Sequence, residues 1–290
     1  YAIVLVLLSM FLPLDAEAAK TNATLFDWKL ANSSVELTDV SYCKPDTYAK
    51  HLFTGLLEGF KLTTRILTFN AFVGTLPSER SIYVVFGGSS SLIDWLFDVD
   101  VHLADYPHCD KCKVHQGYFI DQALCNPIII STVTFLSMLN PHYKIVVTGH
   151  SKGAAQATLA ALDLVHAGYK NVNLVTFGSP RVGNAAFAEY ASSKLGLHYR
   201  VTHYMDIIPS IPTRRQGYTH LSGEWYEYPT LSLYQCSGFE DPDCNAQWGT
   251  KLGLDKEVDI ADSPTDDDST DQQQHPLAPL WLDLIRRGAK

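Results

Sequence analysis

Residues 143–164, with the sequence YKIVVTGHSKGAAQATLAALDL, constrain the fold more than any other stretch of the chain. Residues 145–147 are three consecutive β-branched residues, which is typical of a strand buried on both faces. Residues 154–164 are rich in alanine and leucine and predict a helix. Ser151 therefore falls at a strand-to-helix turn, inside the pattern G-x-S-x-G.

Gly149 and Gly153, which flank the serine, indicate how sharp this turn is. A Cβ two residues before or after Ser151 would collide with neighbouring backbone. The serine then stands at the head of a helix, where unpaired N–H groups and the helix dipole favour negative charge. This is the geometry of a nucleophile elbow. The alternative is a chance match in an ordinary loop, and the flanking strand and helix argue against it.

Strand and helix patterns alternate along the rest of the chain. Strands are predicted at residues 65–72, 81–86, 172–177 and 199–204, and helices at 46–60, 116–139 (interrupted at Pro127) and 185–195. This β-α-β-α-β order predicts a mostly parallel sheet with helices on both faces. Because no repeat or interdomain linker is recognisable, we expect residues 19–290 to form a single α/β domain.

The N-terminal segment and the composition indicate a secreted protein. Residues 1–14 are apolar but shorter than the roughly 20 residues of a membrane span, so we expect no stable span. We interpret residues 1–18 as a secretory signal peptide, truncated at its start, with an A-x-A cleavage site at 16–18. A buried strand or helix is the alternative. The sequons at Asn22 and Asn32 are then glycosylation candidates.

Six cysteines fit an oxidising compartment. Spacing, and elimination for the last pair, favours three disulfides: Cys109–Cys112, Cys236–Cys244 and Cys43–Cys125. Zinc is the alternative for the first pair, since His108 and His115 lie nearby. A second C-x-x-C or paired histidine motif is missing, so we expect no metal.

The charge balance excludes one class of partner. The chain carries 22 Lys and Arg against 31 Asp and Glu, a net charge of −9. A nucleic-acid partner would require a basic face, so none is expected. The same charge gives no general attraction to anionic membranes.

A serine nucleophile requires a base, and the base requires an orienting carboxylate. Asp206 follows the strand predicted at 199–204, where parallel strands gather such groups, and Pro209 and Pro212 stiffen its loop. His220 and His275 come later in the chain, as the order serine, acid, histidine requires. Composition alone does not choose between these two histidines.

Several segments together resemble the class 3 lipases, from about residue 42 to residue 282. These segments are VVFGGSSSLIDWLFDVD, VHQGYF, VVTGHSKGAAQATLAALDL, VTFGSPRVGN, THYMDIIPSIP and YTHLSGEWYEYP. The resemblance implies an α/β-hydrolase fold with Ser151 as nucleophile, Asp206 as acid and His275 as base, and with His220 non-catalytic. Three positions depart from the family pattern. Lys152 replaces the usual leucine, Ala154 replaces the usual glycine, and Pro276 follows the base directly.

The resemblance also implies an oxyanion hole and a lid. Ser89 and the backbone N–H of Lys152 would hold the oxyanion, and a lysine is permitted there because only its N–H is needed. Residues 91–98 would form a short helical lid, with an apolar surface made of Leu92, Ile93, Trp95, Leu96 and Phe97. Without the resemblance, a fixed core helix is the alternative.

These features predict a secreted triacylglycerol lipase that acts at an oil–water interface through an acyl-enzyme, as a monomer, without metal or organic cofactor. A phospholipase A1 or a feruloyl esterase would use the same chemistry on another ester. The apolar lid argues against a feruloyl esterase, and the net charge of −9 mildly disfavours anionic phospholipids. A catalytically silent lipid-binding protein is the alternative from another class.

Overall fold

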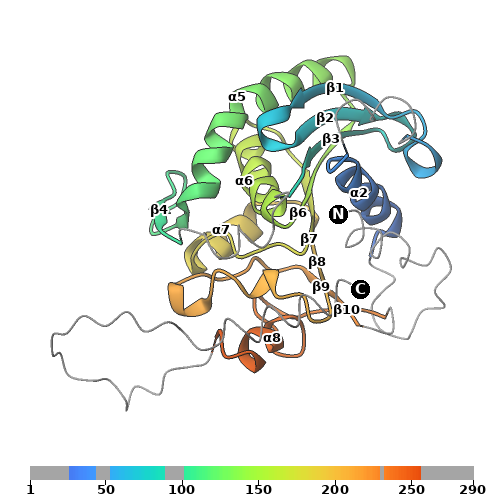
Figure 1. The fold of residues 1–290 in the computed structure, drawn as a ribbon. Helices are drawn as coiled ribbons and strands as arrows, with labels where there is room; N and C mark the ends of the chain where they lie inside the picture. The colour runs from blue at the N-terminus through green and yellow to red at the C-terminus, as the bar shows by residue number, and fades with distance from the viewer. Residues whose placement is uncertain (1–25, 44–52, 89–100, 229–231, 256–290) are drawn as a thin grey trace, which may run out of the picture. The chain divides into compact units, whose positions relative to one another are not determined.

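The computed structural model describes residues 26–43, 53–88, 101–228 and 232–255, all within one compact unit (Figure 1). Its centre is an eight-stranded sheet in the order β1-β2-β3-β6-β7-β8-β9-β10. Five central strands are parallel: β3 (Ser81–Phe86), β6 (Lys144–His150), β7 (Val172–Phe177), β8 (His198–His203) and β9 (Glu224–Glu227). The outer strands are antiparallel: β1 (Lys61–Ile66), β2 (Ala71–Leu76) and β10 (Leu233–Gln235). The predicted mostly parallel sheet is confirmed.

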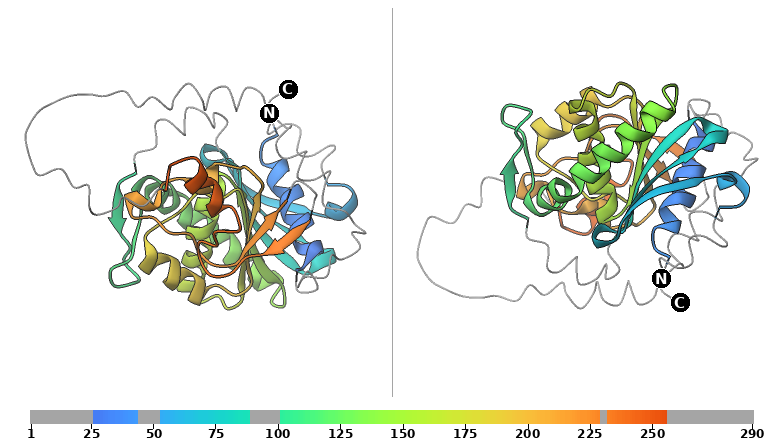
Figure 2. Two further views of the ribbon diagram at one scale, coloured as in Figure 1. Left: turned by 90° about the horizontal axis from the view of Figure 1, so that it is seen from below. Right: turned by 90° about the horizontal axis from the view of Figure 1, so that it is seen from above.

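Helices cover both faces of this sheet, also as predicted (Figures 1 and 2). One face packs against α5 (Gln116–Leu139), α6 (Lys152–His166) and α7 (Ala185–Lys194), and the other against α2 (Trp28–Val40). The remaining elements are the hairpin β4 (Leu103–Asp105) and β5 (Lys113–His115), the helix α8 (Ala246–Lys251), and the 3₁₀ turns η2 (Gly55–Leu57), η3 (Leu67–Phe69), η4 (Pro77–Glu79), η5 (Ile208–Ser210) and η6 (Arg214–Gln216).

The strand β3 shows why the central strands read as continuous apolar runs. Successive side chains of a strand point to opposite faces, and here both faces are covered. Ile82 and Val84 pack into the core under α5 and α6, whereas Tyr83 and Val85 pack into the core under α2. All four are at most 1% exposed.

Three predicted elements differ from the structure. Residues 65–72 are not one strand, because β1 ends at Ile66 and Asn70, at φ 48°, turns the chain into β2. The helix α5 continues through Pro127, which lies on its solvent-exposed side, where the carbonyl that loses its N–H partner can meet water. Of the helix predicted at 46–60, the described part contains only the turn η2.

Two of the three predicted disulfides are present, Cys109–Cys112 and Cys236–Cys244. The third prediction is wrong, because Cys43 and Cys125 are both free. Cys43 follows α2 on one face of the sheet, while Cys125 is buried in α5 on the other, so the sheet separates them.

The glycosylation prediction for Asn32 is not supported by its position. Asn32 lies within α2 and is 8% exposed, which leaves no room for a glycan. Asn22 and the proposed signal peptide at 1–18 lie outside the described residues. The single-domain prediction for 19–290 extends beyond them and stays a prediction.

Candidate active site

Ser151 occupies the sharp turn between β6 and α6. Its backbone has φ 54° and ψ −131°, a left-handed conformation that a non-glycine residue seldom adopts. A Cβ on Gly149 would lie 2.4 Å from the carbonyl oxygen of Gly153, and one on Gly153 would lie 2.6 Å from those of Phe86 and Gly87. Both distances are far below contact, so the predicted reason for the two glycines is confirmed.

The Ser151 hydroxyl is buried, and no hydrogen-bond partner for it lies within the described part of the chain. The backbone N–H of Ser151 donates to Phe177 O at 3.1 Å, which ties the turn to the end of β7. Ser151 precedes α6 as its N-cap, at the helix end where backbone N–H groups lack intrahelical partners, and its side chain caps none of them. Leaving a buried hydroxyl without a hydrogen-bond partner costs free energy, so this oxygen is free to bond to a further group.

Lys152, which stands where the family usually has leucine, forms an ion pair with its side chain. Its Nζ lies 2.7 Å from Oδ2 of Asp121 on α5, and both side chains are about one-third exposed or less (31% and 26%). The ammonium is therefore neither buried without a partner nor simply extended into water. The backbone N–H of Lys152 stays at the head of α6, where the oxyanion prediction placed it.

The strand β3 brings the other predicted oxyanion segment to the serine. A Cβ on Gly88 would lie 3.2 Å from Cβ of Ser151 and 2.9 Å from His150 O, so this backbone passes directly beside the nucleophile. Ser89, the predicted donor, is the next residue and lies outside the described residues, as do lid residues 92–97.

Tyr42 and His150 contact the backbone beside Ser151, and neither was predicted as a site residue. The Tyr42 hydroxyl accepts the Gly88 N–H at 2.9 Å and lies 2.7 Å from Nδ1 of His150. Burial lowers the pKa of His150 to about 4, so its ring is neutral near pH 7. Burial also raises the pKa of Tyr42 well above its usual range, which keeps the hydroxyl protonated. The only feature of the sequence that could have indicated a role for either residue is that His150 directly precedes Ser151.

Asp206 follows β8, at the same edge of the sheet as Ser151, because β6, β7 and β8 are parallel neighbours. Its Oδ1 accepts the Ile208 N–H at 3.0 Å. A Cβ on Gly178 would lie 2.8 Å from Asp206 Oδ2 and 3.5 Å from His150 Nε2, so the carboxylate and this imidazole flank one glycine. Burial raises the pKa of Asp206 to about 6.

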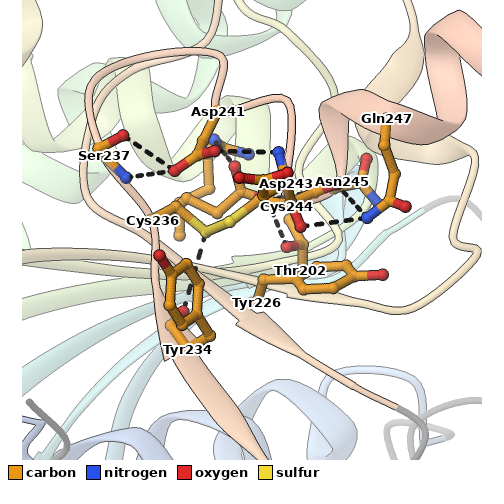
Figure 3. The surroundings of a disulfide bond; sticks show 12 residues. Thr202, Tyr226, Tyr234, Cys236, Ser237, Asp241, Asp243, Cys244, Asn245 and Gln247 are labelled. Carbon is orange, nitrogen blue, oxygen red and sulfur yellow. Dashed lines mark hydrogen bonds and ion pairs between the residues drawn. A yellow bond between two sulfur atoms is a disulfide. The ribbon is translucent and has the colours of Figure 1, made fainter. Parts of the chain in front are cut away.

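The disulfide Cys236–Cys244 lies next to Asn245, which contacts the loop of Asp206 (Figure 3). Asn245 follows the second cysteine, and its Nδ2 donates to the carbonyl of Asp206 at 2.9 Å. Asp241 closes the disulfide loop by accepting the N–H and hydroxyl of Ser237. This disulfide, with Glu224, forms the one cluster of potential metal ligands among the described residues, and cysteines bonded to each other do not bind a metal.

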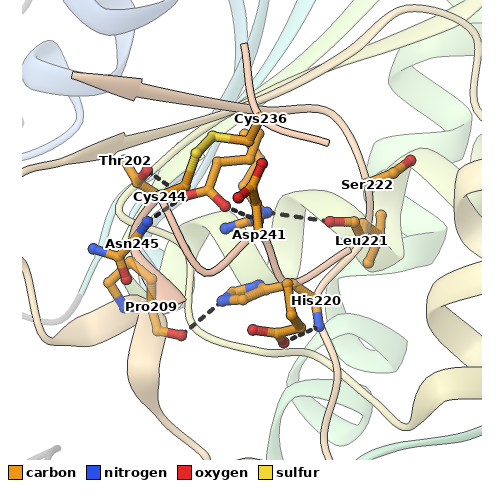
Figure 4. Close-up of polar contacts among 12 residues, drawn as sticks. Thr202, Pro209, His220, Leu221, Ser222, Cys236, Asp241, Cys244 and Asn245 are labelled. Carbon is orange, nitrogen blue, oxygen red and sulfur yellow. Dashed lines mark hydrogen bonds and ion pairs between the residues drawn. A yellow bond between two sulfur atoms is a disulfide. The ribbon is translucent and has the colours of Figure 1, made fainter. Parts of the chain in front are cut away.

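His220 is engaged elsewhere. Its Nε2 donates to the Pro209 carbonyl at 2.6 Å and its backbone N–H donates to Glu240 at 2.9 Å (Figure 4). Burial, reinforced by nearby Arg200 and Arg181, keeps its pKa well below the usual range. His220 therefore supports the loop after Asp206 and is not hydrogen-bonded to the Ser151 hydroxyl. His275, the other candidate base, lies outside the described residues.

Arg181 also contacts the loop that follows Asp206. This fully buried guanidinium binds both carboxylate oxygens of Glu240, at 2.7 and 2.9 Å, and Asp255 at 2.9 Å. It also donates to the carbonyls of Ser210 and Pro212, at 2.7 and 3.0 Å. Burial alone would raise the pKa of Glu240, but its hydrogen bonds to Arg181 and the nearby positive charge lower it to about 2.

Comparison with known proteins places these features in one family. Residues 83–216 match the family model for lipase (class 3). The chain is 31% identical to secreted mono- and diacylglycerol lipase A of Penicillium cyclopium over 228 residues, which cover 77% of this chain and 74% of that protein. It is 37% identical to a Rhizomucor miehei lipase, over 63% of this chain and 52% of that one. A solved triacylglycerol lipase, whose catalytic centre is a serine protease triad, superposes with a TM-score of 0.68 at 31% identity, covering 75% of this chain and 87% of its own.

Proposed function

Because the chain belongs to the class 3 lipases, we propose that it hydrolyses acylglycerols with a catalytic triad of Ser151, Asp206 and His275. Family membership makes it a carboxylic ester hydrolase that acts on lipid, and its relatives are secreted. The two disulfides fit an extracellular protein. The assignment of roles to individual residues is the proposal.

The proposed roles follow the chemistry of a serine triad. Ser151 attacks the ester carbonyl, and His275 accepts its proton and later gives it to the leaving alcohol. Asp206 orients the imidazole and stabilises its charged form. The N–H of Lys152 and the Ser89 donors stabilise the oxyanion, and water then hydrolyses the acyl-enzyme.

One observation carries this proposal: the Ser151 hydroxyl is buried in a left-handed elbow with no partner among the described residues. An imidazole supplied from elsewhere in the chain would satisfy it. Asp206 supports the same conclusion, because a carboxyl whose pKa is raised by burial gains most from a cationic neighbour. Of the two histidines that follow Asp206 in the order of a triad, His220 is already bound to Pro209, which supports His275 for this role.

The relatives suggest which acylglycerols to test. Two of them are named as secreted mono- and diacylglycerol lipases, and a third as a triacylglycerol lipase. We propose tri-, di- and monoacylglycerols as the substrate class, held by a monomeric enzyme. Phospholipids and feruloyl esters serve as comparison substrates.

The test compares wild type with Ser151→Ala, His275→Ala and His220→Ala on a short-chain triacylglycerol, below and above its solubility limit. We expect Ser151→Ala and His275→Ala to fall together by at least about 10⁴ in kcat, because triad members act as a unit. His220→Ala keeps measurable activity if it folds. A fluorophosphonate probe should label wild type and not Ser151→Ala.

Two outcomes would contradict the proposal. If folded wild type resists labelling and hydrolyses no ester, the chain is a silent lipid-binding homologue. If His275→Ala retains activity while folded His220→Ala loses it, the base is wrongly assigned. Circular dichroism of each variant separates loss of chemistry from loss of fold.

A further inference from the structure

The outer face of α5 carries no charged residue from Ile120 to the end of the helix. Figures 1 and 2 show α5 on the outside of the sheet, beside α6. The exposed residues of this stretch, which we call the α5 face, are Ile120, Ala123, Leu124, Pro127, Ile128, Ser131, Thr134, Phe135, Met138 and Leu139. Met138 is 75% exposed, and Leu124 and Leu139 are each 63% exposed.

Such a face is unusual for a helix that packs on a core. The inner side of α5 already buries Cys125, Ile129 and Val133 against the sheet, so a polar outer side would be expected. The one charged residue of the helix, Asp121, is paired with Lys152. Contiguous apolar surface of this kind marks a site of association with another phase or another molecule.

The helix lies on the protein and does not pass through a membrane on its own. By length and hydropathy, α5 is the one helix among the described residues that could cross a bilayer. Its inner side is nevertheless fixed to β1, β2 and β3 within the hydrophobic core. Only the outer side is available, as in helices that lie in the plane of an interface.

We propose that the α5 face adsorbs to a neutral lipid surface, as a contact separate from the catalytic site; the lipid partner rests on the proposed function. The face spans 20 residues, or about 30 Å by about 10 Å, so it offers roughly 300 Å². A stable protein dimer buries about 800 Å² on each partner, so this face alone is too small for a second copy. A lipid surface requires no shape complementarity.

The charge of the α5 face indicates whether its lipid partner is anionic or uncharged. No lysine or arginine lies on the α5 face, and the whole chain carries a net charge of −9. Interfacial helices that bind anionic lipid carry basic residues along their polar edge, which this helix lacks. The partner is therefore uncharged, such as an acylglycerol droplet.

The α5 face also begins close to the nucleophile. Asp121, beside its first residue Ile120, is held at 2.7 Å by Lys152, which follows Ser151. Lipid adsorbed along this face would reach the sheet edge where Ser151 and Asp206 lie.

The test measures adsorption without turnover. Full-length Ser151→Ala is mixed with a triolein emulsion, and bound protein is quantified by flotation. Adding Leu124→Lys with Phe135→Lys should weaken binding at least about tenfold, because two apolar side chains that lipid would bury are replaced by charged ones. Leu197→Lys, at a residue that is 37% exposed away from α5, is the matched control and should bind as the parent does. Met138→Lys alone, at the most exposed position, gives a second measurement if the double variant folds poorly.

Unchanged adsorption of the α5 variants would overturn the inference. So would conversion of a dimer to a monomer by these variants in light scattering, since a second copy would then cover the face. Binding only to anionic vesicles would also contradict it. Hydrolysis of a soluble ester by the same α5 variants with Ser151 intact should stay unchanged, so failure of the catalytic proposal and failure of this one remain distinguishable.

Discussion

The hydroxyl of Tyr42 lies 2.7 Å from Nδ1 of His150, which joins the end of α2 to the residue before the nucleophile. The same hydroxyl accepts the N–H of Gly88, the residue before the proposed oxyanion donor. One tyrosine thus links the two backbone segments that would surround an oxyanion.

We expect Tyr42→Phe to lower kcat by about tenfold with little change in KM, since the oxyanion segment would lose its anchor, a cost of about 1.4 kcal/mol in the transition state. The measurement is steady-state hydrolysis of a soluble short-chain ester. Tyr190→Phe is the matched control, because it removes another tyrosine–histidine hydrogen bond of 2.7 Å, at His166 near the far end of α6. If both variants lost the same amount of kcat, the effect of Tyr42 would be on general stability and not on the oxyanion segment.

Activity should fall as pH falls through about 6. Burial raises the pKa of Asp206 to about 6, so below that pH its carboxyl is protonated and cannot stabilise a charged imidazole. Above that pH the carboxylate is present and activity reaches its plateau. The measurement is kcat/KM for a soluble ester between about pH 4 and pH 9, with circular dichroism to exclude unfolding. A profile that is flat down to about pH 4 would exclude this role for Asp206.

Gly153→Ala should destabilise the fold by about 1–3 kcal/mol and remove most activity, because the new methyl would lie 2.6 Å from the carbonyls of Phe86 and Gly87. Those carbonyls belong to the segment beside Ser151, so relief of the clash moves the site. Urea unfolding and ester hydrolysis check both effects. Gly196→Ala, whose nearest neighbour would lie 3.3 Å away, should stay close to wild type. A fully active Gly153→Ala would show that the elbow tolerates a side chain.

Glu240→Gln should lower the free energy of unfolding by about 3 kcal/mol near neutral pH, because it removes half of the charge that compensates the buried Arg181. Since the folded pKa of Glu240 is about 2 and its ordinary value is 4.5, its contribution is complete above about pH 4.5 and is lost as pH falls toward 2. The difference between variant and wild type should therefore shrink in acid.

Urea unfolding at neutral and acidic pH tests this expectation. Glu189→Gln, at an exposed position of α7, should stay within about 0.5 kcal/mol of wild type at either pH. A Glu240→Gln protein as stable as wild type at neutral pH would contradict the compensation argument.

Features governed by local geometry were predictable from the sequence. The elbow depends on residues within two positions of Ser151, and both confirmed disulfides close short loops. The central strands β6 and β7 show as apolar runs, because both of their faces are buried.

Features that depend on distant parts of the chain were not predictable. Tyr42 and His150 lie 108 positions apart, and nothing in the sequence pairs them. Cys43 and Cys125 were paired by elimination, which ignores the sheet between them. His220 and His275 both satisfy the chain order of a triad; the family resemblance favours His275, and the bond of His220 to Pro209 is the structural observation that agrees with it.

The Arg181 ion pairs bear on the entropy of assembling the active site. They fix Asp255, and the proposed base His275 follows twenty residues later. A base acts within its own chain at an effective concentration that depends on how the segment carrying it is anchored. A buried arginine that takes no part in the proposed chemistry thus fixes Asp255, the last described residue before the proposed base.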